Sequence, residues 1–305
     1  MPDYQSIPLL SLSLSCSFSP VREQNNHNRS SQPIGVFDSG LGGLTVVHAL
    51  NRALPGEDIV YLGDSARVPY GIKSLQTISR FAMEDASFLS RFDPKLIVVA
   101  CNTASAAAID QLREKCDVDV MDVISPGAKM ATEATAGAIG VIATEATIDS
   151  GAYQRAIAEI DPDRQVMAVA CPLLVPIVEE GRDIDDPIVL HVLCDYLRDL
   201  QRLRPGALIL GCTHYPLLSS AIAKLMGPEV TLVNSGAAAA LEVQSLLRSN
   251  HLLNLKNPAD AIGSLQCYTT DKPQRFGRLG RRFGGREIGD VRFVATDELE
   301  VRKET

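Results

Sequence analysis

The sequence lacks tryptophan, is poor in aromatic residues and has no excess of basic residues. The low aromatic content excludes no fold. The charge balance says more, because 29 Lys and Arg stand against 37 Asp and Glu and give a formal net charge of −8. Phosphate binding depends on clustered Lys and Arg, so we expect no nucleic-acid partner. The one basic stretch, Arg275–Arg286, is better explained as a solvated surface helix.

Paired cysteine motifs are also missing. The seven cysteines are an odd number and none belongs to a CxxC pair, so the sequence contains neither a disulfide framework nor a zinc-ribbon spacing. This cysteine usage fits a reducing compartment, and we expect a cytoplasmic protein.

Long apolar runs are absent too. The segment Leu9–Ser19 is interrupted by serines, has Asp3 and no Lys or Arg before it, and lacks a small-x-small cleavage site, unlike a secretory signal. We therefore predict that Met1–Gln32 is a disordered extension. No later stretch approaches the roughly 20 apolar residues of a membrane helix, so no membrane association is expected.

From Pro33 onward, short apolar runs alternate with amphipathic segments, which is typical of βαβ units around a parallel sheet. A chain of this length predicts two α/β lobes with a cleft between them. The predicted strands are Ile34–Phe37, Ile59–Leu62, Leu96–Ala100, Val120–Val123, Ala138–Ala143, Gln165–Ala170, Ala207–Leu210 and Val230–Val233. The predicted helices are Leu44–Ala53, Leu75–Phe92, Ala104–Lys115, Gly151–Ile160 and Pro187–Leu203.

Polar, turn-rich clusters follow four of these strands. Ligands of open α/β sheets bind outside the carboxyl ends of the strands, so these clusters are the candidate site. They are Asp38-Ser39-Gly40, Cys101-Asn102-Thr103, Thr144–Thr147 and Cys212-Thr213-His214.

Two of the clusters repeat one arrangement. VVACNTASA (Val98–Ala106) and LILGCTHYP (Leu208–Pro216) both run from an apolar strand through a cysteine and two polar residues into a helix. At such a corner the sulfur lies near backbone N–H groups and the positive end of a helix dipole. We therefore predict that the pKa of both thiols is lowered below the free value of about 8.5.

Two thiols at such corners suit one reaction in particular. Removing the α-proton of an amino acid and returning it to the opposite face needs two acid/base groups, and a thiolate with a thiol can supply them. Asp38 and His214 are candidates to set the protonation states. Ser39, Asn102, Thr103 and Thr213 could hold the carboxylates and ammonium of the substrate. The arrangement requires neither a metal nor an organic cofactor.

Simpler explanations apply to other residues. A cysteine at a strand end is usually a small core residue, and we assign Cys116, Cys171, Cys194 and Cys267 to core or surface. His214 could merely cap its helix. The loop Gly40–Gly43 resembles a phosphate cradle but matches neither nucleotide-binding pattern, which leaves small-anion binding open.

Six segments together resemble the glutamate racemase family in order and spacing. The resemblance covers essentially Pro33 to the end, and its segments are GVFDSGLGGLTV (Gly35–Val46), GDSARVPYG (Gly63–Gly71), ACNTAS (Ala100–Ser105), SGAYQRAI (Ser150–Ile157), CPLLVPIVEEG (Cys171–Gly181) and GCTHYPLL (Gly211–Leu218).

This resemblance implies conversion of L-glutamate to D-glutamate for bacterial peptidoglycan, with neither pyridoxal phosphate nor a metal. Cys101 and Cys212 match the two proton donors and acceptors, and Glu179 matches a further acidic position. Thr144 and Thr147 match positions near the substrate. The substrate-binding positions are matched by Asp38, Ser39, Tyr70, Gly71, Asn102, Thr103, Thr213 and His214.

The resemblance also implies two similar lobes with mostly parallel sheets flanked by helices and the active site in the cleft between them. We expect residues 33–123 and 238–305 in a discontinuous first lobe and residues 124–237 in the second. We also expect a homodimer, whose arrangement the sequence does not give. Ala143, Ala146 and Asn234 depart from the family pattern, which puts the local loop geometry in question.

Three alternatives stay open at this point. One is an aspartate racemase or another two-cysteine isomerase of the same superfamily. The second, from a different class, is a thiol redox or metal-binding protein that uses the same cysteines. The third is a catalytically inactive binding protein in which the two cysteines are dispensable.

Overall fold

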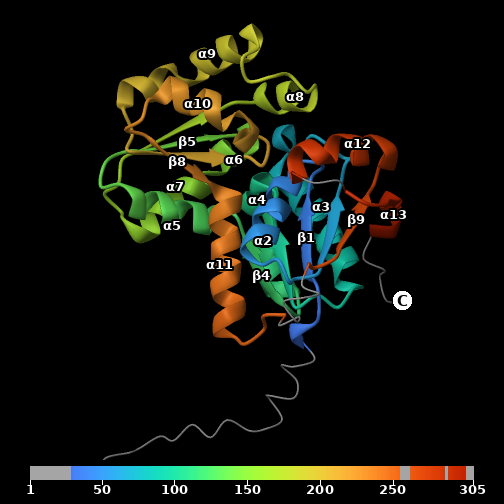
Figure 1. The fold of residues 1–305 in the computed structure, drawn as a ribbon. Helices are drawn as coiled ribbons and strands as arrows, with labels where there is room; N and C mark the ends of the chain where they lie inside the picture. The colour runs from blue at the N-terminus through green and yellow to red at the C-terminus, as the bar shows by residue number, and fades with distance from the viewer. Residues whose placement is uncertain (1–28, 255–261, 286–287, 300–305) are drawn as a thin grey trace, which may run out of the picture.

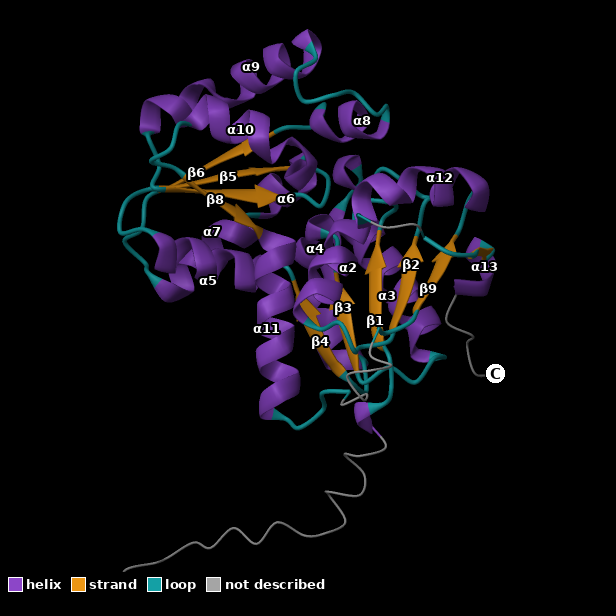
Figure 2. Ribbon diagram, viewed as in Figure 1, coloured by secondary structure: helices purple, strands orange, loops and turns teal. Residues whose placement is uncertain are grey.

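The structure, a computed structural model, describes residues 29–254, 262–285 and 288–299. These residues form two parallel β-sheets flanked by helices (Figures 1 and 2). The two-lobe α/β fold predicted from the sequence is confirmed. Residues 1–28 lie outside the described part, and with them most of the predicted N-terminal extension.

The first sheet has six strands in the order β10-β9-β2-β1-β3-β4, all parallel. Its centre is β1, whose five residues are all buried and whose Ile34 is paired with Ile59 on one side and Leu96 on the other. Burial on both faces explains the unbroken apolar run at this strand. The strands are β1 (Ile34–Asp38), β2 (Ile59–Gly63), β3 (Leu96–Val99), β4 (Asp119–Asp122), β9 (Leu265–Thr269) and β10 (Val291–Phe293).

The second sheet has four parallel strands in the order β6-β5-β7-β8. Its members are β5 (Ile139–Ala143), β6 (Val166–Ala170), β7 (Ala207–Gly211) and β8 (Thr231–Asn234). The helices around both sheets are α2 (Leu44–Ala53), α3 (Leu75–Ser90), α4 (Asn102–Lys115), α5 (Ile124–Ala134), α6 (Glu145–Ser150), α7 (Ala152–Ile160), α8 (Leu174–Glu179), α9 (Pro187–Leu203), α10 (Ser219–Met226), α11 (Ser235–Ser249), α12 (Pro273–Gly284) and α13 (Thr296–Leu299), with short 3₁₀ turns η1 (Tyr70–Ile72) and η2 (Tyr215–Leu218).

The predicted strands and helices are confirmed, each strand to within one residue at either end. The strands β9 and β10 were missed. The basic stretch near the C-terminus does form a helix, α12, but only one side of it faces solvent. Phe276 and Phe283 are buried on the other side, against the first lobe.

The long helix α11 lies where the lobes meet and contacts α2 of the first and α5 of the second (Figure 1). The contact with α2 is close, since a Cβ on Gly236 would lie 2.8 Å from Val46 Cγ2. Asn234 begins this helix, and its Oδ1 accepts hydrogen bonds from the N–H groups of Gly236 (3.0 Å) and Ala237 (3.2 Å). Asn234, which departs from the family pattern, is therefore an effective N-cap of α11.

The carboxyl ends of the two sheets face each other. Every strand pairing is parallel, so all strands of a sheet end at the same edge. Across the junction, α6 of the second lobe contacts α4 and η1 of the first. Within the described part of the chain, no helix combines the length and apolar character needed to span a bilayer.

Candidate active site

Cys101 follows β3 and is the N-cap of α4, as the strand-to-helix pattern predicts. Its Sγ accepts a hydrogen bond from the Ala104 N–H at 3.5 Å and lies 3.8 Å from Ser39 Oγ, to which the thiol donates. The side chain is buried, with 6% of its surface exposed. The sulfur thus belongs to a closed polar corner of the first lobe.

The pKa of Cys101 is shifted in the direction opposite to the prediction. Burial raises it, the charge of Asp38 raises it further, and together they bring the Cys101 pKa to about 12. The hydrogen bonds from Ala104 and to Ser39 lower this pKa by less. The predicted lowering is therefore wrong for Cys101, because removal from water outweighs the helix N-terminus. At neutral pH this residue is a thiol.

Asp38 is the last residue of β1 and is fully buried. Its Oδ2 accepts hydrogen bonds from the N–H groups of Gly40 (3.1 Å) and Gly43 (2.9 Å). Its Oδ1 accepts none from the described residues. Burial raises the Asp38 pKa, and the charge of His214 and the two N–H groups work against that rise. The glycine-rich loop therefore surrounds the protein's own carboxylate.

Tyr61 holds this loop in place, a role that the sequence pattern gave no sign of. From the middle of β2 its hydroxyl donates to the Gly40 carbonyl oxygen at 2.6 Å. A Cβ on Gly43 would lie 2.5 Å from Asp38 Cβ and 2.8 Å from the Tyr61 hydroxyl. Only glycine fits there.

Cys212 follows β7 in the second lobe and has a different set of partners. Its Sγ lies 3.8 Å from His214 Nδ1, and His214 Nε2 lies 3.1 Å from Glu179 Oε1 on α8. The Phe283 ring of α12 meets the imidazole edge-on, with centroids 5.3 Å apart. The imidazole is therefore fixed from three sides.

The environment of His214 favours the imidazolium. Burial lowers the His214 pKa, but hydrogen bonds and negative charge from Cys212 and Glu179 outweigh burial and raise it to about 10. The hydrogen bond with His214 in turn lowers the Glu179 pKa. A buried imidazolium therefore lies 3.8 Å from the Cys212 sulfur.

The two cysteine corners meet at the junction of the lobes. A Cβ on Gly42 would lie 2.1 Å from Thr213 Oγ1, and Thr45 Oγ1 donates to the Thr213 carbonyl oxygen at 3.0 Å. The two sulfurs are near enough that charge on Cys212 raises the pKa of Cys101. The structure thus brings Asp38 and Ser39 together with both cysteine clusters.

The remaining polar residues form contacts across the same junction. Thr103 Oγ1 lies 2.9 Å from Thr144 Oγ1 and 3.2 Å from Thr147 Oγ1, on α6 and its N-cap. Asn102 is fixed by Tyr153, whose hydroxyl donates to its Oδ1 at 2.6 Å. Sequence reasoning gave Tyr153 no role, although it lies in a family-like segment.

The side chain of Tyr70 does not join the cysteines. Its hydroxyl lies within hydrogen-bond distance of Asp64 and Asp85, away from the polar corners. Gly71 does reach the junction, since a Cβ there would lie 2.8 Å from Thr144 Cβ. At this segment the phenol is engaged by the two carboxylates, and Gly71 is the residue that lies at the junction.

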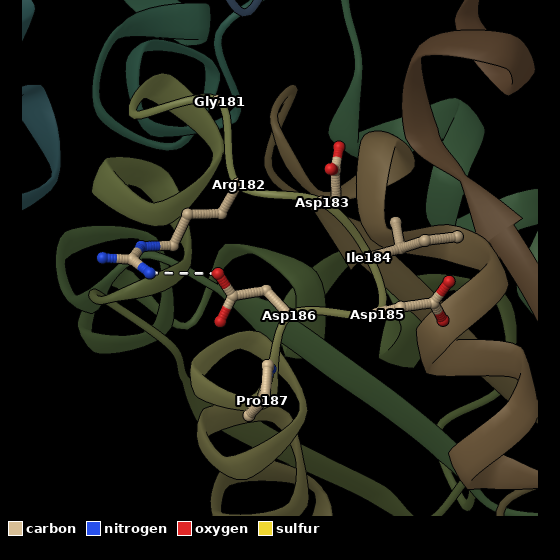
Figure 3. Close-up of a pocket in the computed structure, with 7 residues that line it drawn as sticks. All are labelled: Gly181, Arg182, Asp183, Ile184, Asp185, Asp186 and Pro187. Carbon is tan, nitrogen blue, oxygen red and sulfur yellow. Dashed lines mark hydrogen bonds and ion pairs between the residues drawn. The ribbon is translucent and has the colours of Figure 1, made fainter.

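A surface cavity of about 650 Å³ lies beside this junction, on the loop from Gly181 to Pro187 (Figure 3). It contains none of the predicted site residues. Arg182 Nη1 donates to Asp186 Oδ2 at 3.0 Å, and Arg282 of α12 donates to the Arg182 carbonyl oxygen at 2.6 Å. The loop that follows Glu179 is thereby tied to the first lobe.

The titratable side chains of the site are suited to acid and base chemistry. Over residues 29–254, 262–285 and 288–299, no three His, Cys, Asp or Glu side chains are grouped so as to hold a metal ion. None of the six cysteines in these residues forms a disulfide.

Known proteins are similar to this chain in both sequence and fold. The Asp/Glu/Hydantoin racemase family matches residues 34–243. A glutamate racemase from Geobacter metallireducens is 47% identical over 273 residues, which span 89% of this chain and 98% of the relative. The structure of a glutamate racemase isoform from Bacillus anthracis superposes with a TM-score of 0.83 at 39% identity and covers 87% of this chain and 98% of its own. A Francisella tularensis glutamate racemase in complex with D-glutamate superposes with a TM-score of 0.81 at 41% identity, covering 88% and 99%.

Proposed function

This chain belongs to the Asp/Glu/Hydantoin racemase family, and we propose that it interconverts L-glutamate and D-glutamate at the junction of its two lobes. The observation that carries the proposal is the pair of cysteine corners, one from each sheet, that meet there with different partners. The glutamate racemases among its relatives support the choice of substrate.

The reaction is a two-base proton transfer. The thiolate of one cysteine takes the α-proton from one face of the substrate, and the thiol of the other gives a proton to the opposite face. One S–H bond forms as the other breaks, so the proton count of the pair is unchanged. The raised pKa of Cys101 keeps it a thiol, and His214, whose pKa is raised, lies beside Cys212 as a proton partner.

The surrounding polar residues bind the substrate. Asp38 presents a buried, unoccupied carboxylate oxygen to the ammonium group. Hydroxyl, amide and backbone N–H groups around the junction hold the two carboxylates. These groups belong to Ser39, Tyr70, Gly71, Asn102, Thr103, Thr213 and His214, with the Tyr70 contribution made by its backbone.

A substrate panel tests the proposal. Purified protein is incubated with single L- and D-amino acids, and loss of optical activity is followed by circular dichroism. We expect turnover of both glutamate enantiomers. Turnover of aspartate in place of glutamate would move the protein to the neighbouring activity of its superfamily.

The product has a clear use and setting. D-glutamate made here supplies bacterial peptidoglycan, and thiols that must stay reduced for catalysis support a cytoplasmic location. Its lobes comprise residues 33–123 with 238–305, and residues 124–237. It works as a homodimer, which light scattering coupled to gel filtration tests through the molar mass in solution.

A further inference from the structure

A buried charged cluster underlies the segment that carries Tyr70 and Gly71. At its centre is Arg67, which donates from Nε to Asp64 Oδ2 at 2.6 Å and from Nη2 to Asp85 Oδ1 at 3.1 Å, and which also pairs with Glu84. The guanidinium lies 4.1 Å from the centre of the Phe81 ring. Asp64 and Asp85 are fully buried. We call these residues the Arg67 cluster.

The geometry requires an arginine. Three carboxylates surround one cation, and a planar guanidinium can donate to all three in fixed directions. A lysine ammonium at the same position could not reach them together. Without this cation, Asp64 and Asp85 would be buried without a counter-charge, which is strongly destabilising for both.

The Tyr70 hydroxyl completes the cluster. It lies against Asp64 Oδ2 and 3.1 Å from Asp85 Oδ2, yet it has one hydrogen to give. The hydroxyl can therefore donate to Asp64 or to Asp85, and it lies within reach of both. Burial and the charge of Asp64 raise the Asp85 pKa, while the charge of Arg67 and the hydrogen bond from Tyr70 work against that rise.

This network ends at the candidate site. Tyr70 begins the turn η1, and the next residue, Gly71, packs against Thr144 across the lobe junction. Thr144 is hydrogen-bonded to Thr103, next to Cys101. Among the described residues, the hydrogen-bond partners of the Tyr70 hydroxyl belong to the Arg67 cluster, which thereby helps to place the backbone at Tyr70 and Gly71.

We propose that Arg67 is a positioning residue for substrate binding, which acts through Asp64, Asp85 and the Tyr70 hydroxyl on the backbone at Tyr70 and Gly71. The proposal rests on the proposed function, since it takes this backbone to receive a substrate carboxylate. It assigns the buried charges a role in affinity and none in proton transfer.

The test compares kcat and KM for both glutamate enantiomers in the full chain. In Arg67→Lys and Tyr70→Phe we expect KM to rise about tenfold with kcat changed less than about threefold, the pattern of a lost binding contribution. Arg80→Lys is the matched control, because Arg80 lies near the same Phe81 and Glu84 but is 67% exposed. Its KM should stay at the wild-type value.

Asp85 supplies a second pair of variants. Asp85→Asn keeps a polar partner for the Tyr70 hydroxyl and an acceptor for Arg67, so its KM should stay within about twofold of wild type. Asp85→Ala removes both and should match Arg67→Lys. This difference separates the role of the network from simple loss of stability, which is followed in parallel by thermal unfolding.

The outcomes are distinct. Unchanged KM in Arg67→Lys and Tyr70→Phe, with wild type active on glutamate, overturns the positioning role alone. If Arg67→Lys does not fold, Tyr70→Phe decides the question, since it removes a single hydroxyl. Equal damage from Asp85→Asn and Asp85→Ala also contradicts the network. A wild type inactive on glutamate overturns the proposed function and the positioning role with it.

Discussion

The two cysteine corners begin from the same local sequence pattern and end in opposite electrostatic surroundings. Cys101 lies beside the Asp38 carboxylate and the Ser39 hydroxyl, whereas Cys212 lies beside the imidazole of His214, itself paired with Glu179. Burial and the negative charge of Asp38 raise the pKa of the first sulfur and favour its thiol, whereas the second sulfur has a buried imidazole beside it. A repeated strand-to-helix corner thus fixes where each sulfur lies, while Asp38 and Glu179, which are distant in sequence, make the surroundings of the two sulfurs different.

The largest effect is expected when one of the two cysteines is replaced at a time. Cys101→Ser and Cys212→Ser should each lower racemisation about a thousandfold or more in both directions, because each direction needs both groups. Each variant should still eliminate the leaving group of a β-substituted analogue, but from opposite enantiomers. Polarimetry and release of the leaving group measure the two reactions. Near-normal racemisation by either variant would contradict the two-base mechanism.

A smaller effect is expected when only the partner of Cys212 changes. Glu179→Gln removes the charge that helps raise the His214 pKa above its ordinary value, so less imidazolium is present at alkaline pH. We expect kcat to fall about tenfold, with the alkaline limb of the kcat profile moved to lower pH. Glu180→Gln is the control, because Glu180 is the adjacent carboxylate and pairs with Arg182 instead. If the pH profile of kcat in Glu179→Gln does not move, Glu179 does not control the protonation of His214.

On the Cys101 side, the loop around Asp38 offers a subtler change. Tyr61→Phe leaves the Gly40 carbonyl oxygen without its buried donor, at a cost of about 1–3 kcal/mol to stability, and loosens the loop. We expect kcat/KM to fall about fivefold. Tyr196→Phe, which removes a hydroxyl bound to the Leu173 N–H on the second lobe, should leave kcat/KM unchanged. Equal effects in both variants would mean that Tyr61 acts only on stability.

The smallest expected effect is on stability as a function of pH. The His214 pKa is raised to about 10, so its stabilising contribution is complete below its unfolded value of about 6.5 and is lost as pH rises through 10. The melting temperature of wild type should therefore exceed that of Glu179→Gln by about 3 °C near pH 6, with the gap closing toward pH 10. A gap that widens as pH rises would reverse the assigned sign.

Local pattern predicted the strands and the cysteine corners because both are set by short-range chemistry. Leu96 to Cys101, for example, is an apolar run followed by a turn, and it forms a buried strand with a site residue at its end. The strands β9 and β10 were not predicted because β9 mixes polar and apolar residues and the edge strand β10 has only three residues.

The errors at the site concern how deeply the Cys101 sulfur is buried and which way the Tyr70 side chain points. The local sequence encodes neither. The corner at Cys101 has the expected helix N-terminus, but nothing in VVACNTASA reports how completely the fold removes the sulfur from water. Tyr70 was predicted in the right segment, yet its hydroxyl is turned toward Arg67 and its partners. Phe283 could have been anticipated, because Phe276 and Phe283 lie seven residues apart on one face of a basic helix.

The position of α12 near the end of the sequence also orders events during synthesis. His214 takes its final orientation against Phe283, and the loop after Glu179 is anchored by Arg282, both supplied by α12. A ribosome translates these residues after every strand of the second sheet, so a nascent chain can build that lobe well before it can orient the imidazole. Both sulfurs precede α12 in the sequence, so the nascent chain cannot complete the acid–base site until α12 has been translated.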